Sequence, residues 1–136
     1  MAAKLKLEIV TPSSKVYSED VDMVTLPGVE GEMGIYPQHV PLLTQVTAGE
    51  VIARKDGADQ CLAVGDGFVE ITGDHVVIMT DMAISAESID ENKAEEARRR
   101  AEERMKEKMG ADEAAMVSAS LAQALAQLKV KRRQRH

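Results

Sequence analysis

The sequence predicts an α+β fold, in which an N-terminal antiparallel β-sandwich is followed by a C-terminal α-helical hairpin. Three observations lead to this prediction. Apolar and polar residues alternate in the first part of the chain, turn signals recur there at the roughly 8–12-residue spacing of sandwiches, and an alanine-rich, highly charged composition begins near residue 87. We therefore expect two domains, a sandwich over residues 1–86 and a helical hairpin over residues 87–136.

The first strand is predicted at Leu5, Leu7 and Ile9, which alternate with charged residues and would bury one face of the strand. The same alternation begins again at residues 21–26. No long helical crossover separates the apolar runs of this region, as parallel pairing would require. We therefore expect the strands to pair antiparallel.

Two turns are predicted to join strands directly. The Asp56–Gly57 pair lies between the apolar runs 51–53 and 61–64, which is a strong hairpin signal. The Gly73–Asp74 pair separates two further apolar runs in the same way. Both positions favour tight hairpins.

Residues 27–44 are unusually rich in glycine and proline, with Gly28, Gly31, Gly34, Pro27, Pro37 and Pro41. This density excludes a helix and argues against a long, flat strand. We expect tight turns and bulges that hold Glu30, Glu32 and His39 outward on a stiff frame. Loops of this kind carry recognition more often than packing.

A helix is predicted to begin at Ser88, because Ser88 and Glu91 have the spacing of a capping box. Gly110 would end this helix. Its expected apolar stripe is Ala94, Ala97, Ala101, Met105 and Met109, and its expected i,i+4 ion pairs are Glu95–Arg99, Glu96–Arg100 and Glu102–Lys106.

A second helix is predicted to begin near Asp112 and Glu113. Its expected stripe is Val117, Leu121, Ala124, Leu125 and Leu128. Because both stripes are rich in small residues, the helices should hold each other and the sandwich weakly. The hairpin is then either a mobile arm or a marginally stable appendage.

Charge is distributed unevenly along the chain. Residues 1–88 contain five basic and fourteen acidic residues, a net charge of −9, whereas residues 89–136 contain twelve basic and nine acidic residues, a net charge of +3. Five of the last eight residues are basic. Because this end has no aromatic residues for stacking and the whole chain is acidic, an acidic protein surface suits it better than nucleic acid, with a merely solvated end as the alternative.

The composition also bears on the cell compartment and on chemistry. The single cysteine, Cys61, excludes an internal disulfide, and its apolar neighbours favour a buried strand position over a reactive thiol. The N-terminal residues do not form a signal peptide, and no run approaches the roughly 20 apolar residues of a membrane span. We expect a soluble protein that meets a membrane only through a partner.

No combination of residues predicts an active site. Adjacent carboxylates such as Glu30 and Glu32 in a turn are usually solvated. The separations of His39, Cys61 and His75 do not match a zinc site, and the glycines of residues 28–34 lie among acidic residues that would repel phosphate. We expect no catalytic residue, no metal and no cofactor.

The run from Pro27 to Thr44 resembles the signature of the epsilon subunit of F-type ATP synthase, bacterial type, and the order of sandwich, signature, glycine pair and charged hairpin extends the resemblance over nearly the whole chain. The resemblance implies a non-catalytic central-stalk subunit of a rotary proton-translocating ATP synthase. It would link the gamma subunit to the ring of c subunits for torque transmission and coupling. It would lie peripherally on the cytoplasmic face of the cell membrane.

The resemblance also implies positions for the contacts. Glu32 and His39 match positions that meet the c ring, with Glu30 nearby. The helical hairpin would inhibit ATP hydrolysis by extending between gamma and the beta (and alpha) subunits. The residues matching its basic contacts are Arg98, Arg99, Arg100, Arg104, Lys129, Lys131, Arg132 and Arg133, with Arg135 beyond them.

Two departures from the family pattern bear on function. Some members bind ATP through a motif that matches residues 89–94, but Lys93 replaces its arginine and lacks the planar fork of a guanidinium. Asp90, Lys93 and Arg100 are thus doubtful nucleotide ligands, and we expect ATP binding to be weak or absent. Asp66 interrupts the usual glycine pair. The alternative to the family reading is a free-standing adaptor that bridges two protein partners.

Overall fold

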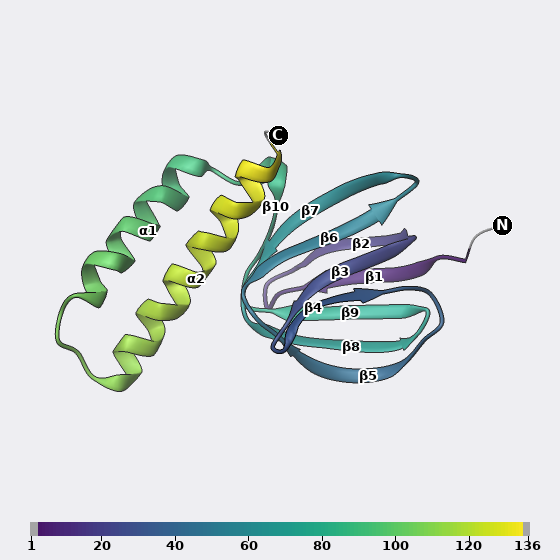
Figure 1. Ribbon diagram of the computed structural model, residues 1–136, viewed down its shortest axis with the longest axis horizontal. Coiled ribbons are helices and arrows are strands. Elements are labelled where there is room, and N and C mark those ends of the chain that lie inside the picture. The colour runs from purple at the N-terminus through teal and green to yellow at the C-terminus, as the bar shows by residue number, and fades with distance from the viewer. Residues whose placement is uncertain (1–2, 135–136) are drawn as a thin grey trace.

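The computed structural model describes residues 3–134 of the 136-residue chain. Arg135, which belongs to the basic end discussed above, lies outside the described residues. The strands are β1 (Leu5–Val10), β2 (Lys15–Val21), β3 (Met23–Gly28), β4 (Gly31–Ile35), β5 (His39–Val46), β6 (Gly49–Lys55), β7 (Ala58–Val64), β8 (Gly67–Gly73), β9 (His75–Thr80) and β10 (Ala83–Ser85). A 3₁₀ turn, η1 (Ala86–Ser88), precedes α1 (Glu91–Met105) and α2 (Ala111–Gln134), as Figure 1 shows.

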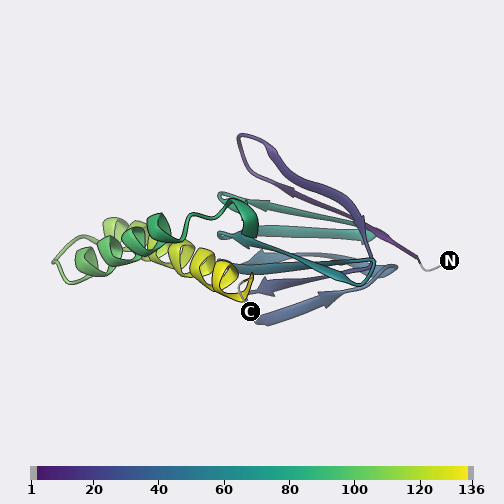
Figure 2. The same ribbon diagram turned by 90° about the horizontal axis from the view of Figure 1, so that it is seen from above.

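The strands form a sandwich followed by a two-helix hairpin, which confirms the predicted fold class. Their hydrogen-bonded order is β10-β7-β6-β3-β5-β8-β9-β1-β2, with β4 paired to β3. The join between β3 and β5 rests on one residue pair, Gly28 and Val46, so the sheet bends there and its two halves face each other. The hairpin projects from one end of the sandwich, and the N-terminus lies at the opposite end (Figure 2).

The core lies between the two halves and consists of aliphatic side chains. In β1, Leu5, Leu7 and Ile9 are buried and alternate with partly exposed residues, as predicted. Each strand from β2 to β9 also contributes at least one buried residue, with Val21 from β2 and Ile35 from β4. The two-residue period of a strand fixes which side chains face outward.

The two predicted hairpin turns are present. Asp56 and Gly57 both have positive φ, 52° and 83°, which the tight turn between β6 and β7 requires. Gly73 has a φ of 57° where β8 turns into β9.

One strand pair differs from the antiparallel prediction, because β1 and β9 pair parallel, from Lys6–His75 to Val10–Met79. The prediction assumed that parallel neighbours need a helical crossover. Here the whole set of intervening strands forms the connection, and the two meet when the sandwich closes.

The glycine- and proline-rich stretch contains more strand than predicted. β3 and β4 form a hairpin around a two-residue turn, and Pro27 lies within β3. Pro27 donates no hydrogen bond, but its carbonyl oxygen accepts one from the Thr47 amide, 2.9 Å away. Pro41 lies where the register between β5 and β8 shifts, so the pairing is irregular there.

The prediction for the start and end of α1 was wrong by a few residues at each end. Ser88 belongs to η1, and Asp90 caps the helix by accepting a hydrogen bond from the Lys93 amide at 3.2 Å. The helix ends at Met105. Gly110 instead lies immediately before α2, and its carbonyl accepts a hydrogen bond from the Ala114 amide.

The helical stripes were predicted only in part. Ala94, Ala101, Val117, Ala124 and Leu128 are buried, but Met105 and Leu125 are exposed. The predicted ion pairs along α1 are replaced, within the described residues, by pairs of Arg98 with Glu95 and Glu102 and of Lys106 with Glu103. Within residues 3–134, neither α-helix is both long enough and apolar enough to cross a membrane.

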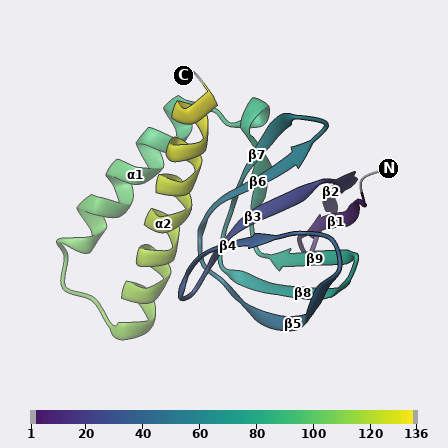
Figure 3. The ribbon, with the colours of Figure 1, turned by 45° about the vertical axis from the view of Figure 1, so that its right-hand side comes forward.

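α2 lies between α1 and the sandwich, over β6 and β7 (Figures 1 and 3). The contact combines alanines with a few larger apolar side chains, among them Met82 and Ile84. Ala126 and Val130 of α2 pack with Ala63, Ala86 and Ile89 in a second apolar cluster, separate from the main core. Alanine side chains bury little area each, so a weak hold of the hairpin on the sandwich stays a prediction.

Candidate interaction surfaces

An exposed apolar row crosses the outer face of the half-sheet formed by β5, β8, β9 and β1. The register aligns Phe68 with Met79, and Met79 with Val10. On β5, Leu43 lies on the same face, opposite Glu70, whereas Gln45 is the residue opposite Phe68. Leu43 is 64% exposed, Phe68 50% and Met79 41%. Large apolar side chains exposed on one face of a sheet make that face a candidate protein interaction site.

Sequence reasoning missed this row, although a signal was present. Val69 and Ile71 of β8 are buried, so Phe68 must point to the opposite face. Ile78 is buried in β9, which places Met79 outward in the same way. Large apolar residues out of phase with the buried set are the signal for an outward-facing interface.

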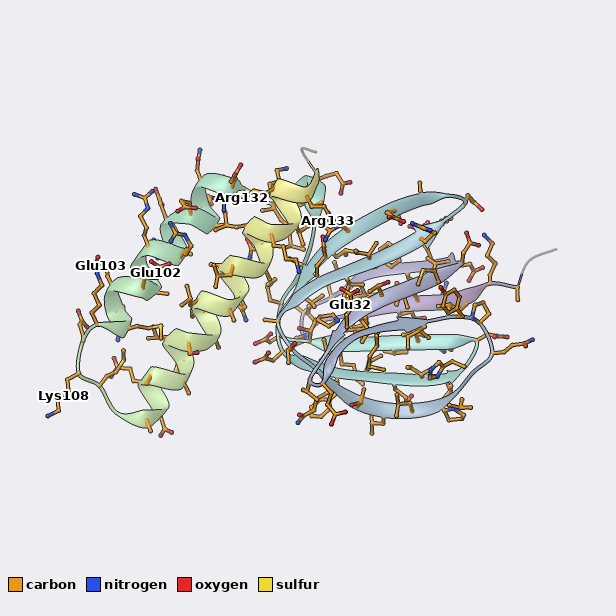
Figure 4. All side chains as sticks on the ribbon, viewed as in Figure 1. Glu32, Glu102, Glu103, Lys108, Arg132 and Arg133 are labelled. Atoms are coloured by element: carbon orange, nitrogen blue, oxygen red, sulfur yellow. The ribbon has the colours of Figure 1, made fainter. Side chains whose placement is uncertain are left out.

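The proposed c-ring residues do not form one cluster. Glu30 lies in the turn before β4, and Glu32 points away from the core on β4 itself; both are exposed (Figure 4 labels Glu32). His39 is half-buried at the start of β5, past the other end of β4, and its Nδ1 lies 2.7 Å from the Val40 carbonyl oxygen. The five residues of β4 separate Glu30 from His39 by roughly 15 Å.

Half of the eight basic residues proposed for the arm pair with acidic residues in the structure. Arg98 pairs with Glu95 and Glu102 along α1. The Arg98 guanidinium is the main cause of a lowered pKa of the Glu95 carboxyl. The other pairs join elements: Arg104 with Glu113 and Glu107, Arg132 with Glu91 and Glu95, and Arg133 with Glu50.

Among the other four proposed contact residues, Arg99, Arg100 and Lys129 have exposed side chains. Lys131 donates a hydrogen bond to the Ala86 carbonyl at 3.1 Å. The docked hairpin therefore uses much of its positive charge internally.

A groove of about 780 Å³ lies between α1 and α2. Lys93, Arg100 and Arg104 line it from α1, and Glu113 and Gln127 are among its residues from α2. The structure thus brings together two of the three doubtful nucleotide ligands. Asp90 does not line the groove, because its carboxylate caps the helix.

Comparison with known proteins identifies relatives of both parts of the chain. Residues 4–86 match the family described as the ATP synthase delta/epsilon chain, beta-sandwich domain, and residues 87–132 match its long alpha-helix domain. The ATP synthase epsilon chain of Dehalococcoides mccartyi is 46% identical, covering 98% of this chain and 96% of the relative. The epsilon chain of Syntrophobacter fumaroxidans is 43% identical, covering 96% and 97%.

Solved structures share the fold. A chain in the mitochondrial ATP synthase of Euglena gracilis, solved as OSCP/F1/c-ring, superposes with a TM-score of 0.77 at 22% identity, covering 93% of this chain and 80% of that one. A chain of the central stalk/c-ring structure from Tetrahymena thermophila superposes with a TM-score of 0.52 at 15% identity, covering 63% of this chain and 69% of that one.

Proposed function

The chain belongs to the ATP synthase delta/epsilon family, as one of its epsilon chains, and we propose that it links the gamma subunit to the c ring in the central stalk and restrains ATP hydrolysis through its helices. It has no active site of its own in this role. Residues 1–86 form the binding domain, and residues 87–136 form the regulatory arm. The complex holds the chain peripherally at the cytoplasmic face of the membrane.

The observation that carries the proposal is the apolar row on the sandwich. Leu43, Phe68 and Met79 expose large apolar side chains on one side of a sheet whose opposite side contributes to the core. Burial of such side chains contributes about 1.5–3 kcal/mol each when a partner covers them. We assign this face to the gamma subunit, which the family pattern expects on one face of the sandwich.

Contact with the c ring is assigned to Glu30, Glu32 and His39. The two glutamates are exposed at and beside a tight turn, where the short hairpin of β3 and β4 limits their motion. Because His39 lies past the other end of β4, it contributes a second, separate point of contact.

The arm acts by leaving the sandwich. The apolar cluster beneath α2 is small, which makes release of the arm inexpensive, and release frees the basic residues that now pair within the molecule. Together with Arg99, Arg100 and Lys129, these residues complement an acidic surface on beta, and added salt weakens such contacts.

ATP binding to the groove between the helices is weak or absent. Lys93 and Arg100 line the groove, but Lys93 offers a point charge in place of a bidentate fork, and Glu113 adds a negative charge to the lining. Isothermal calorimetry of the isolated chain with micromolar ATP should give no clear heat of binding.

Two substitutions on β8 test the gamma assignment. Phe68→Glu places a charge in the middle of the apolar row and should prevent co-purification with gamma, whereas Thr72→Glu, exposed on the same face of the same strand, should not. If both variants co-purify with alpha, beta and gamma as the wild type does, the row is not the gamma interface. If the wild type itself fails to co-purify, the free-standing adaptor becomes the better reading.

Crosslinking tests the c-ring assignment. Cys61→Ser removes the single cysteine, so Glu32→Cys and His39→Cys can each be introduced alone, with Glu103→Cys on the arm as the control. Both sandwich variants should crosslink to c in the assembled complex. Failure of either would remove that residue from the interface.

A further inference from the structure

Glu50 is a buried carboxylate on the outside of the sandwich. Val51 and Ala53 of β6 face the main core, so Glu50 points from the opposite side of the strand, toward α2. It is nevertheless only 7% exposed, because the last turns of α2 cover it. A charged group removed from water in this way is costly unless another charge compensates it.

Arg133 supplies the compensating charge. Its Nε lies 2.9 Å from Glu50 Oε2, and within the described residues that oxygen accepts no aligned hydrogen bond. The contact is therefore an ion pair whose strength comes from charge and low solvent access. Figure 4 shows Arg133 on the side of α2 that faces the sandwich.

The other contacts between α2 and the sandwich are apolar packing and hydrogen bonds, not ion pairs. Ala126 and Val130 bury small side chains. Gln123 Nε2 donates to Asp81 Oδ2 at 3.2 Å, and Lys131 Nζ donates to the Ala86 carbonyl at 3.1 Å. The other ion pairs of the hairpin found within residues 3–133 join its two helices or lie along α1 and the segment after it.

We propose that Glu50 and Arg133 form a latch that holds the hairpin on the sandwich, and that losing the pair releases α2 while leaving the sandwich folded. The reason lies in what covers Glu50. Because α2 covers Glu50, an unpaired Glu50 carboxylate becomes hydrated when α2 dissociates from the sandwich. The strands of the sandwich do not have to separate for this. Removal of one partner of a buried pair is far more disruptive than replacement of both.

The latch also provides a route to regulated release. Arg133 is about half exposed, so a carboxylate of a partner protein can approach it and compete with Glu50. The neighbouring Arg132 instead pairs with Glu91 and Glu95 of α1, so the two helices remain joined when the latch opens. The partner chemistry that opens the latch is therefore an acidic protein surface.

This inference rests on the mobile arm of the proposed function, but it concerns the isolated chain and can be tested without the ATP synthase. Cys61 provides a native reporter. It lies on the same outer face of β7 as Ala63, packed at the edge of the cluster beneath α2. Release of α2 should expose its thiol to a disulfide reagent such as dithionitrobenzoate.

The key variant is Arg133→Gln. Burial raises the pKa of the Cys61 thiol, Glu50 raises it further, and Arg133 opposes them. Loss of Arg133 without release would therefore slow the reaction, whereas release of α2 should accelerate it about tenfold or more. The two effects have opposite signs, so an unchanged or slower rate would overturn the latch.

The double variant Glu50→Gln, Arg133→Gln removes the buried charge together with its partner. Because Glu50→Gln also removes a cause of the raised pKa of Cys61, this variant is compared by hydrogen exchange and not by thiol reaction. Its α2 amides should be better protected than those of Arg133→Gln alone, since an uncharged amide at position 50 can stay covered at lower cost than an unpaired carboxylate. Arg132→Gln, which changes the adjacent charge on α2 but not the latch, should react at the wild-type rate. Equal acceleration by Arg132→Gln would show that the effect is not specific to the Glu50 pair.

Hydrogen exchange separates release from general unfolding. In Arg133→Gln, the amides of α2 should exchange faster while those of β1, β8 and β9 keep their wild-type protection. Equal loss of protection in the strands would mean that the pair stabilises the whole fold, and the latch would be refuted. The arm could still inhibit ATP hydrolysis by another route, so this result would leave the proposed function standing.

Discussion

At the scale of single residues, two glycines around the turn from β7 to β8 lie in close packing, and at Gly67 the neighbour is backbone. A Cβ atom on Gly67 would lie 1.9 Å from the Met79 carbonyl oxygen, and one on Gly65 would lie 2.2 Å from Asp81 Oδ1. Asp66, between them, does not have positive φ, and its carboxylate accepts a hydrogen bond from the Ala48 amide at 2.9 Å. The interruption of the family's glycine pair is therefore accommodated without backbone strain.

This packing predicts that Gly67→Ala destabilises the sandwich by about 1–3 kcal/mol, because the backbone of β9 must move to admit the methyl group. Gly110→Ala is the matched control, since a Cβ atom at that position would have no neighbour within 4 Å and the φ of Gly110 is not positive. The free energy of unfolding in urea measures both. Equal stability of the two variants would contradict the packing argument.

Tyr17 makes the stability of the fold depend on pH. Burial, with a smaller contribution from Glu19, raises the pKa of its phenol to about 12. The phenol of an unfolded chain titrates near a pKa of about 10. The raised pKa therefore contributes stability that is fully present below about pH 10 and is lost as the pH rises from about 10 to 12.

The measurement uses Tyr36→Phe, which leaves Tyr17 as the one tyrosine of the chain. Its absorbance titration should show a midpoint near pH 12, and the stability advantage over a variant that also carries Tyr17→Phe should shrink as the pH approaches that value. A midpoint at about pH 10, the ordinary value of a solvated phenol, would show that Tyr17 is not sheltered. Tyr17 donates a hydrogen bond to Gln60, which helps join the edge strand β2 to β7.

At the scale of elements, local patterns predicted the parts of the fold that depend on local chemistry. The Asp56–Gly57 turn was predictable because few residues other than glycine and aspartate tolerate positive φ. The parallel pairing of β1 with β9 was not predictable in this way, since it depends on how residues about 70 positions apart meet when the sandwich closes.

In the candidate surfaces too, only features that depend on local sequence could be predicted. The exposed positions of Glu30 and Glu32 followed from the turn-rich sequence. Arg98 was predictable as a charged surface residue, but its partners were not, because the choice between Glu95 and other neighbours depends on rotamers. The contact of Arg133 with Glu50 joins residues from different domains of the prediction, and no local pattern indicates it.

The identity of the residue that caps α1 can be tested by substitution. Asp90 accepts a hydrogen bond from the Lys93 amide, so Asp90→Ala should lower stability by about 1 kcal/mol, while Ser88→Ala should have little effect. Helix content by circular dichroism and unfolding in urea together report the change. A larger loss of stability for Ser88→Ala than for Asp90→Ala would show that Ser88 caps the helix, as the sequence predicted.

At the scale of the whole molecule, the sandwich and the helical hairpin differ in how they are packed, and the interface between them is small. The sandwich has a continuous aliphatic core, whereas the hairpin rests on a smaller apolar cluster and on the ion pair of Arg133 with the buried Glu50. This asymmetry allows the helices to move while the sandwich stays bound to its partners. The account of function depends on that division of roles.

The most direct test is ATP hydrolysis by the purified ATP synthase complex that carries this chain either whole or truncated after Glu87. The account predicts a large rise in hydrolysis on truncation, with the shortened chain still present in the complex. Unchanged hydrolysis, with the truncated chain bound and coupling intact, would contradict the proposal that the helices restrain the enzyme.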